Sequence, residues 1–218
     1  MMWSQPELKS SMGAWCAAMR AAAPELNELD GRLGDADLGA TLEKCAVLIE
    51  QELGSLPDDL EGAFKKLAQA CARASGSSFG TLLTVAFMTA AKYSSNKTSL
   101  SRQDIVDLLN TVIETLSVRG GASLGDKTVL DGLQAIYVAL QTSAEERRLL
   151  PLARDAVQRA LDEFRGKPNR IGRARMFAER TIGMDDPGMV ALSRMVEGLD
   201  IQTTRYPAGV PRRIASKS

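Results

Sequence analysis

Hydrophobic residues recur at helical spacing along almost the whole chain, and this periodicity constrains the fold more than any other feature of the sequence. One stripe follows the spacing i, i+3, i+4, i+7, i+8 and i+11 and consists of Ile105, Leu108, Leu109, Val112, Ile113 and Leu116. The sequence contains no run of alternating β-branched residues, the pattern typical of a strand. The chain is therefore predicted to be all-α.

The spacing predicts about eight helices, at 4–22, 38–54, 57–74, 78–93, 102–118, 128–142, 145–165 and 187–199. Capping patterns agree with these limits: Ser4 with Glu7 and Ser101 with Asp104 form capping boxes, and Gly120 ends a helix. Because the connections between these helices are short, successive helices are expected to run antiparallel, as in an up-and-down bundle or a helical barrel.

The composition excludes several classes of function. The 218 residues contain no histidine, which rules out Ser-His-Asp and Cys-His nucleophiles, His-ligated zinc or haem, and a phosphohistidine on this chain. Twenty-seven basic residues balance 27 acidic residues, so the net charge points to neither a nucleic acid nor a membrane as partner. We expect no signal peptide and no bilayer-spanning segment, and three cysteines without a close pair indicate reduced thiols, so a cytoplasmic protein is expected.

Three stretches depart from the helical pattern. Residues 29–39 combine Gly with Asp, and residues 166–188 combine Gly and Pro with Arg. Long irregular loops in an otherwise helical protein are commonly functional. Residues 201–218 contain two prolines, four basic residues and no acidic residue, which predicts a flexible basic tail after a domain of residues 1–200.

Three aspartates, Asp30, Asp35 and Asp37, lie within eight positions directly before a predicted helix. Clustered carboxylates repel one another unless a cation neutralises them, and oxygen ligands suit Mg²⁺ or Ca²⁺ rather than zinc. An EF-hand loop is excluded because, counted from Asp35, its sixth position is Ala40 and its twelfth is Ala46. The alternative is that Asp35 and Asp37 cap the following helix and that Asp30 is a solvated turn residue.

The segment RGGASLGDKTVLDGL is similar to a P-loop, because Gly120 and Gly125 have the right separation and Lys127 and Thr128 follow. Asp126 interrupts the motif, and the preceding element is a helix rather than a buried strand, so a P-loop is excluded. The free amides of the helix start could still receive phosphate. The alternative is a plain connection between helices, capped by Asp126 or Thr128.

Two further segments suit phosphate. Residues 74–81 form another small-residue turn before a helix, and the second irregular stretch contains Arg170, Arg173, Arg175 and Arg180. Guanidinium groups suit phosphate oxygens, although a solvated loop also has this composition. Because loops at the same end of an up-and-down bundle can meet, the aspartates, the helix starts and a guanidinium could hold a nucleotide together.

Four segments, in this order, resemble the signature blocks of a known family, the nucleotide-binding L subunit of bacterial dihydroxyacetone kinases. They are LDGRLGDADLG (29–39), ASGSSFGTLL (74–83), GDKTVLDGL (125–133) and GRARMFAERTIGMDDPG (172–188). This DhaL-like resemblance implies an eight-helix antiparallel up-and-down barrel. It also implies that ADP or ATP is held at one end of the barrel through two Mg²⁺ ions.

The resemblance assigns residues by position. Asp30, Asp35 and Asp37 match the family's magnesium ligands. The positions that match its nucleotide-binding turns, pocket and closing loop are Leu38, Gly39, Thr41, Ala74, Ser75, Gly120, Val129, Arg173, Asp186, Pro187 and Gly188. At Leu38 and Met184 the sequence departs from the family, which usually has histidine there, so side-chain contacts are lost but no carboxylate is.

The resemblance implies a ketose kinase subunit that is active only with a partner. In that family a histidine of a separate K subunit holds dihydroxyacetone or a related short ketose such as erythrulose. The donor is either exchangeable Mg-ATP or a tightly bound ADP recharged by a phosphotransferase-system M subunit. No catalytic side chain is expected here, because the metal site positions the donor. A homodimer stays open, and the alternative function is a non-catalytic nucleotide-binding or regulatory module acting through protein partners.

Overall fold

The computed structural model describes residues 2–74, 76–143 and 149–199, and these residues are mostly helical. Its long helices are α1 (Gln5–Leu33), α2 (Leu38–Glu52), α3 (Leu60–Ala74), α4 (Ser78–Tyr93), α5 (Arg102–Gly120), α6 (Val129–Thr142), α7 (Leu149–Arg165) and α8 (Pro187–Gly198). Short 3-10 helices are η1 (Leu53–Ser55), η2 (Arg173–Met176) and η3 (Ala178–Thr181). Two short strands, β1 (Trp3–Ser4) and β2 (Ser99–Leu100), pair antiparallel, with Trp3 opposite Leu100.

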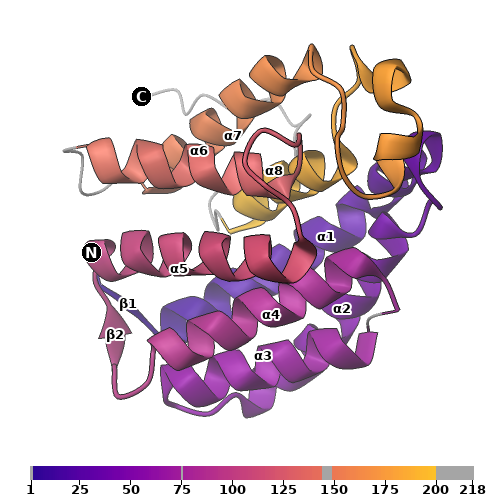
Figure 1. The fold of residues 1–218 in the computed structure, drawn as a ribbon. Helices are drawn as coiled ribbons and strands as arrows, with labels where there is room; N and C mark the ends of the chain where they lie inside the picture. The colour runs from indigo at the N-terminus through magenta and orange to yellow at the C-terminus, as the bar shows by residue number, and fades with distance from the viewer. Residues whose placement is uncertain (1, 75, 144–148, 200–218) are drawn as a thin grey trace, which may run out of the picture.

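The long helices form a closed ring. Each helix packs against the next one in the chain, and α8 packs against α1. In Figure 1, α1 to α4 make up the lower part of the barrel, α6 to α8 make up the upper part, and α5 lies between them. The prediction of an all-α, eight-helix antiparallel barrel is confirmed.

Because successive helices alternate in direction, the odd-numbered helices end and the even-numbered helices begin at the same end of the barrel. We call this end the mouth; it consists of the last turns of α1, α3, α5 and α7 and the first turns of α2, α4, α6 and α8. A hydrogen bond of 3.0 Å from the Thr41 hydroxyl to the Ser77 hydroxyl joins the starts of α2 and α4. The four segments of the family resemblance therefore all reach the mouth.

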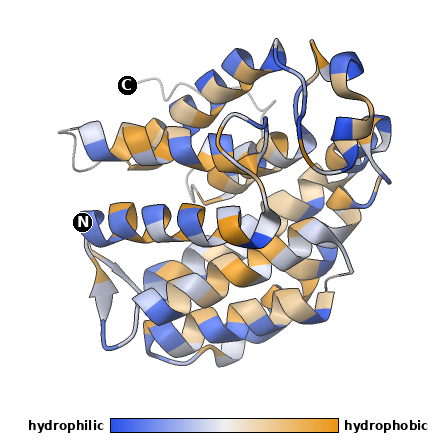
Figure 2. Ribbon diagram, in the orientation of Figure 1, coloured by the Kyte–Doolittle hydropathy of each residue, from blue (hydrophilic) through white to orange (hydrophobic). Residues whose placement is uncertain are grey.

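The core consists of aliphatic side chains that the helices direct inward, among them Leu26, Leu42, Ile49, Leu60 and Leu67, all fully buried. Figure 2 shows orange hydrophobic bands that alternate with hydrophilic ones around most helices, as expected for helices with one buried face. Burying each such leucine or isoleucine contributes about 1.5–3 kcal/mol. Packing of these faces, more than any polar contact, positions the helix ends that form the mouth.

The first helix is longer than predicted. The sequence pattern ended it near residue 22 and left 29–39 irregular, whereas α1 continues through Pro24 to Leu33. Ala23, Leu26 and Leu33 are buried at positions that continue the helical stripe, so tertiary packing outweighs the local helix-breaking tendency of Pro24 and Gly31. The irregular connection shrinks to residues 34–37.

The other helix limits are close to the predicted ones. Capping boxes are present at Ser4 and at Ser101. The helix α5 ends at Gly120, and the next residue, Gly121, adopts a left-handed conformation with φ 65°. The helix predicted from 57 starts at Leu60. The predicted start of the seventh helix at 145 and the tail 201–218 lie outside the described residues. None of the helices described is long and apolar enough to cross a membrane.

Candidate functional site

The structure brings the three aspartates together at the mouth. One carboxylate oxygen from each of Asp30, Asp35 and Asp37 lies within 4.8 Å of the others. Asp30 is on the last turn of α1, Asp35 is in the connection, and Asp37 directly precedes α2. We call these three residues the acidic cluster.

Backbone amides fix the acidic cluster. The Asp37 N–H donates to Asp30 Oδ2 at 2.9 Å, and the Leu38 N–H approaches the same oxygen at 3.4 Å. Ala36 adopts a left-handed conformation with φ 61°, which reverses the chain between Asp35 and Asp37. The Asp37 side chain makes no capping hydrogen bond to α2, and Asp30 is helical, so neither has the role that the capping alternative gives it.

The electrostatics of the acidic cluster favour a cation. Burial raises the pKa of Asp37 above its ordinary value, the negative charges of Asp35 and Asp30 raise it further, and Arg173 opposes the rise. Three carboxylates with only oxygen ligands suit a hard ion such as Mg²⁺, which commonly keeps waters or phosphate oxygens in its remaining positions. The residues present therefore fit a magnesium ion.

The start of α2 adjoins the acidic cluster. Gly39 lies so close to α1 that a Cβ atom there would be 2.0 Å from the carbonyl oxygen of Ala23, so α1 and α2 touch through their backbones. Thr41 is buried and links α2 to α4 through its hydroxyl. Ala74, predicted for the second turn, is the buried last residue of α3, and Ser75 lies outside the described residues.

The starts of α6 and α8 meet the start of α4. A Cβ atom on Gly188 would lie 3.5 Å from the Phe79 ring and 3.8 Å from Val129 Cβ, so Gly188 lies beside both residues. Gly120, at the end of α5, lies beside Leu82 of α4, where a Cβ atom would be 3.5 Å from the leucine side chain. The predicted pocket residue Gly120 and the predicted closing-loop residue Gly188 thus lie against α4, and the pocket residue Val129 lies beside Gly188.

Asp186 and Pro187 start α8. The Asp186 carboxylate caps the helix by accepting the Met189 N–H at 2.9 Å and also accepts a bond of 2.8 Å from Asn169 Nδ2. Burial raises the pKa of Asp186 to about 6, and these hydrogen bonds limit the rise. Pro187 is the buried first residue of α8. In this structure the contacts of Asp186 fix the helix start.

The arginine-rich segment lies at the mouth. Arg173 Nη1 is 2.8 Å from Asp35 Oδ2, so the 3-10 helix η2 directs this guanidinium at the acidic cluster. Arg170, Arg175 and Arg180 are exposed, and Arg180 lies over the Phe177 ring at 5.7 Å. Of the four predicted arginines, Arg173 is the one that forms an ion pair with the acidic cluster in the part of the chain that the structure describes.

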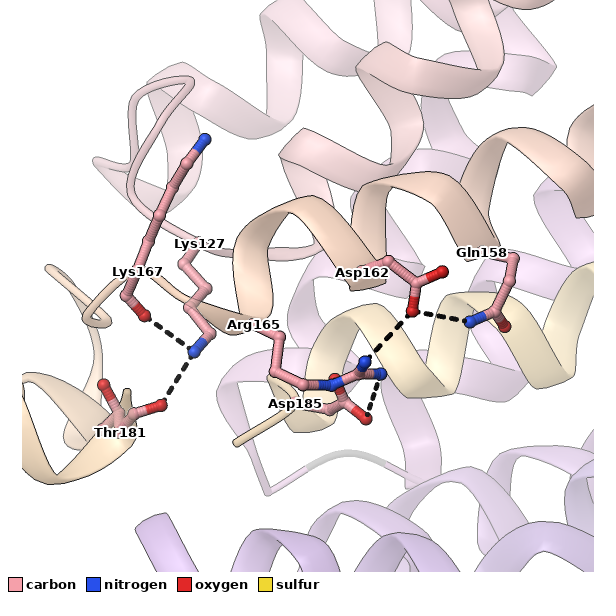
Figure 3. Close-up of polar contacts among 7 residues, drawn as sticks. All are labelled: Lys127, Gln158, Asp162, Arg165, Lys167, Thr181 and Asp185. Carbon is pink, nitrogen blue, oxygen red and sulfur yellow. Dashed lines mark hydrogen bonds and ion pairs between the residues drawn. The ribbon is translucent and has the colours of Figure 1, made fainter. Parts of the chain in front are cut away.

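Lys127, the lysine of the interrupted P-loop motif, does not face the mouth. Its side chain is fully buried, and Nζ donates to the carbonyl oxygens of Lys167 at 2.8 Å and Thr181 at 2.9 Å (Figure 3). The preceding element is α5, so exclusion of a P-loop is consistent with the structure. Thr128 caps α6, as the alternative of a plain connection between helices predicts, and its N–H donates to Asp131 Oδ2 at 2.8 Å.

Sequence reasoning did not single out Asn169 or Thr181, both buried beside Lys127. Their roles depend on contacts between distant segments, for which the sequence has no local signal. A separate groove of about 710 Å³ runs between α6 and α7 and contains none of the predicted site residues. The acidic cluster, with its opposing arginine, is the better candidate because charge and geometry converge there.

Comparison with known proteins agrees with the fold and with the family resemblance. The DAK2 domain pattern matches residues 32–200. The chain is 27% identical over 179 residues to the ADP-binding subunit DhaL of the PEP-dependent dihydroxyacetone kinase of Escherichia coli strain K12, which covers 80% of this chain and 85% of that protein. It is 29% identical, with the same coverage, to the corresponding subunit of the PTS-dependent kinase of Lactococcus lactis strain IL1403.

A solved structure is also similar. The crystal structure of the dihydroxyacetone kinase of C. freundii in complex with AMP-PNP and Mg²⁺ superposes with a TM-score of 0.70 at 25% identity, over 88% of this chain. This chain spans 33% of the length of that protein. The family match, which extends over most of the chain, shows that this protein belongs to the DAK2 domain family.

Proposed function

We propose that this chain is the nucleotide-binding subunit of a ketose kinase. It would donate phosphate from Mg-ATP, or from a recharged tightly bound ADP, to dihydroxyacetone or a related short ketose such as erythrulose held on a separate K-type subunit. Relatives named as ADP-binding subunits and as an L-erythrulose kinase support this proposal. The observation that carries it is the acidic cluster, which faces Arg173 beside the starts of α2 and α4.

The residues have complementary roles toward a nucleotide. Asp30, Asp35 and Asp37 would hold Mg²⁺, which neutralises phosphate charge when bound. The starts of α2 and α4 direct the positive ends of two helix dipoles at the mouth, although in α2 the Leu38 and Ala40 N–H groups already donate to Asp30 and Asn27. Arg173 can provide a guanidinium to a phosphate oxygen, and this change of partner would leave Asp35 to the metal.

The chain needs a partner for the acceptor half of the reaction. Phosphoryl transfer depends on charge neutralisation and in-line positioning, which this mouth can supply without a covalent nucleophile. With no histidine in the chain, the ketose cannot be held here through a histidine. A K-type subunit would therefore dock over the mouth, and an M-type subunit would be required only if a bound ADP is recharged.

The replacement at Leu38 bears on which phosphate donor the subunit uses. Its side chain is buried in the core, so only its backbone is available at the start of α2. Met184, at the other departure from the family pattern, is half-buried before α8. Fewer side-chain contacts to phosphate favour an exchangeable nucleotide. The same two replacements are the observation that favours the second candidate, a non-catalytic nucleotide-binding or regulatory module that acts through protein partners.

A coupled assay with a K-type partner tests the proposal. Product is expected only when both proteins, Mg²⁺ and a phosphate donor are present, and Asp35→Asn should abolish it. Asp58→Asn, at an exposed position beyond α2, is the matched control and should retain turnover. Unchanged turnover in Asp35→Asn would show that the acidic cluster is not the metal site, whereas nucleotide binding without turnover would favour the non-catalytic module.

Thermal stability separates binding from turnover. A ligand at one hundred times its dissociation constant adds about 2.7 kcal/mol to the free energy of unfolding. For a domain of this size, this gain raises the melting temperature by roughly 5–10 °C. The increase should require both Mg²⁺ and ADP or ATP and should be lost in Asp35→Asn. The absence of any increase in the unmodified protein would contradict nucleotide binding.

A further inference from the structure

Lys127 is a fully buried charged side chain to which the proposed function assigns no role. Removing an ammonium group from water is costly unless hydrogen bonds replace the lost hydration. Here the replacement comes from two backbone carbonyl oxygens, of Lys167 at 2.8 Å and of Thr181 at 2.9 Å. Burial lowers the pKa of Lys127, while the nearby carboxylates of Asp186 and Asp185 oppose this effect.

The two carbonyls come from opposite ends of one loop. Lys167 follows the end of α7, and Thr181 closes η3 shortly before α8. Figure 3 shows the lysine between these two points, with its nitrogen directed at both carbonyl oxygens. We call the segment between them, residues 168–180, the arginine loop, because it contains four arginines.

Neighbouring contacts tie the arginine loop to the same turn. Asn169 donates from Nδ2 to the Lys127 carbonyl oxygen at 3.0 Å, and its N–H donates to the Thr181 hydroxyl at 2.8 Å. The Arg170 N–H donates to the Asp126 carbonyl oxygen at 3.1 Å. These bonds attach the part of the loop before Arg173 to residues 126–127. The Lys127 ammonium group also holds the part after Arg173, through the Thr181 carbonyl oxygen.

The base of the arginine loop is closed independently of Lys127. Arg165 forms a two-pronged ion pair with Asp185, with Nε to Oδ1 at 2.9 Å and Nη2 to Oδ2 at 3.2 Å (Figure 3). The Gly183 N–H donates to the Arg165 carbonyl oxygen at 2.8 Å. Loss of Lys127 should therefore loosen the arginine loop without detaching α7 from the start of α8.

We propose that Lys127 is a positioning residue whose buried ammonium group holds the arginine loop in the conformation that directs Arg173 at the acidic cluster. Lys127 itself contacts no phosphate, unlike the lysine of a P-loop. The anchoring of the arginine loop by Lys127 depends only on these hydrogen bonds. Its effect on nucleotide affinity rests on the proposed function. Two experiments separate these two parts.

The first experiment measures the loop by limited trypsin digestion of the folded protein. Lys127→Met should accelerate cleavage after Arg170, Arg173, Arg175 and Arg180 by about tenfold, because the population of the open loop sets the rate. Lys127→Arg, which keeps donors at this position, should restore part of the protection. The matched control Lys65→Met removes a lysine on the exposed face of α3 and should cleave like the unmodified protein.

Equal cleavage rates in Lys127→Met and the unmodified protein would overturn the anchor. Loss of the folded state in both Lys127 variants would also overturn it, because the proposal confines the effect to the arginine loop. Equal acceleration of cleavage at sites outside residues 168–180 would also overturn the anchor.

The second experiment is a double-mutant cycle on the affinity for Mg-ADP. Lys127→Met and Arg173→Ala should each weaken binding by about tenfold, the effect of losing one charge-assisted hydrogen bond. If Lys127 acts by placing Arg173, Lys127→Met should add less than about twofold in the Arg173→Ala background. Additive losses would overturn the positioning role. If the unmodified protein does not bind Mg-ADP, the proposed function fails, while the digestion still decides whether Lys127 anchors the loop.

Discussion

Gly39→Ala should disturb the acidic cluster without changing any of its carboxylates. A Cβ atom at position 39 would lie 2.0 Å from the carbonyl oxygen of Ala23 and 2.8 Å from Asn27 Oδ1. Carbon and carbonyl oxygen ordinarily touch at about 3.3 Å, so α2 would have to retreat from α1 by about 1.3 Å. Asn27 cannot easily give way, because its Oδ1 accepts the Ala40 N–H at 3.0 Å.

Two consequences follow from this displacement. The first is a loss of stability of about 3 kcal/mol, the upper part of the usual range for overpacking, because the clash is with backbone. The second concerns Asp30 at the end of α1 and Asp37 before α2, whose carboxylates would separate. Since Mg²⁺ requires ligands at about 2.0–2.1 Å, a movement of this size should weaken Mg-ADP binding by at least about tenfold.

Gly54→Ala provides the matched control, because a Cβ atom at this exposed position meets nothing within 4 Å. Thermal unfolding without ligand should show a melting temperature lower by about 6–12 °C for Gly39→Ala and little change for Gly54→Ala. Titration calorimetry with Mg-ADP then measures the second effect at a temperature where both variants are folded. A Gly39→Ala protein with unchanged melting temperature and affinity would refute the close contact between α1 and α2.

Three further predictions concern other parts of the fold. The pKa of Asp186 rises from 3.8 to about 6 in the folded protein, so the native state binds this proton more tightly than the unfolded state does. As the pH rises from about 4 to about 6, the free energy of unfolding should therefore fall, relative to that of Asp186→Asn, by at most about 3 kcal/mol. Parallel urea-unfolding profiles of the two proteins across this range would contradict this prediction. Thr128→Ala removes the hydroxyl that accepts the Leu130 N–H at 3.1 Å and should lower the free energy of unfolding by about 1 kcal/mol in urea denaturation, whereas no change would show that the cap is dispensable. Cys16, Cys45 and Cys71 are buried, and burial raises the pKa of Cys16 to about 12, so iodoacetamide at pH 8 should label the three thiols in urea but not in the native protein; rapid native labelling would contradict this.

The sequence was most informative where structure depends on neighbouring residues. Helix spacing and capping pairs such as Ser101 with Asp104 are local, and the predicted limits fall close to the observed ones. The acidic cluster could be predicted for the same reason, since its three carboxylates lie within eight positions and a single turn brings them together.

Contacts between distant segments could not be predicted from the residues alone. Pro24 and Gly31 locally favour a helix end, but burial of Leu26 and Leu33 against other helices extends α1 beyond both. Lys127 follows a glycine-rich turn, where exposure is expected, and it is buried because two carbonyls of a remote loop accept its protons. Such choices depend on which groups are available in space to satisfy a buried charge.

The closed ring of helices has a consequence for the connectivity of the chain. Gly198 lies against Trp15 and Ala18 of α1. Trp15 is about 15 Å along the helix axis from Gln5, the first residue of this helix. Gln5 in turn donates to the carbonyl oxygen of Pro57 at 2.9 Å, so the turn between α2 and α3 lies at the same pole. A linker of about six residues could therefore join α8 to α1, with new termini opened near Pro57. A circularly permuted chain of this kind should keep every contact around the acidic cluster, because all the changes are made at the opposite pole.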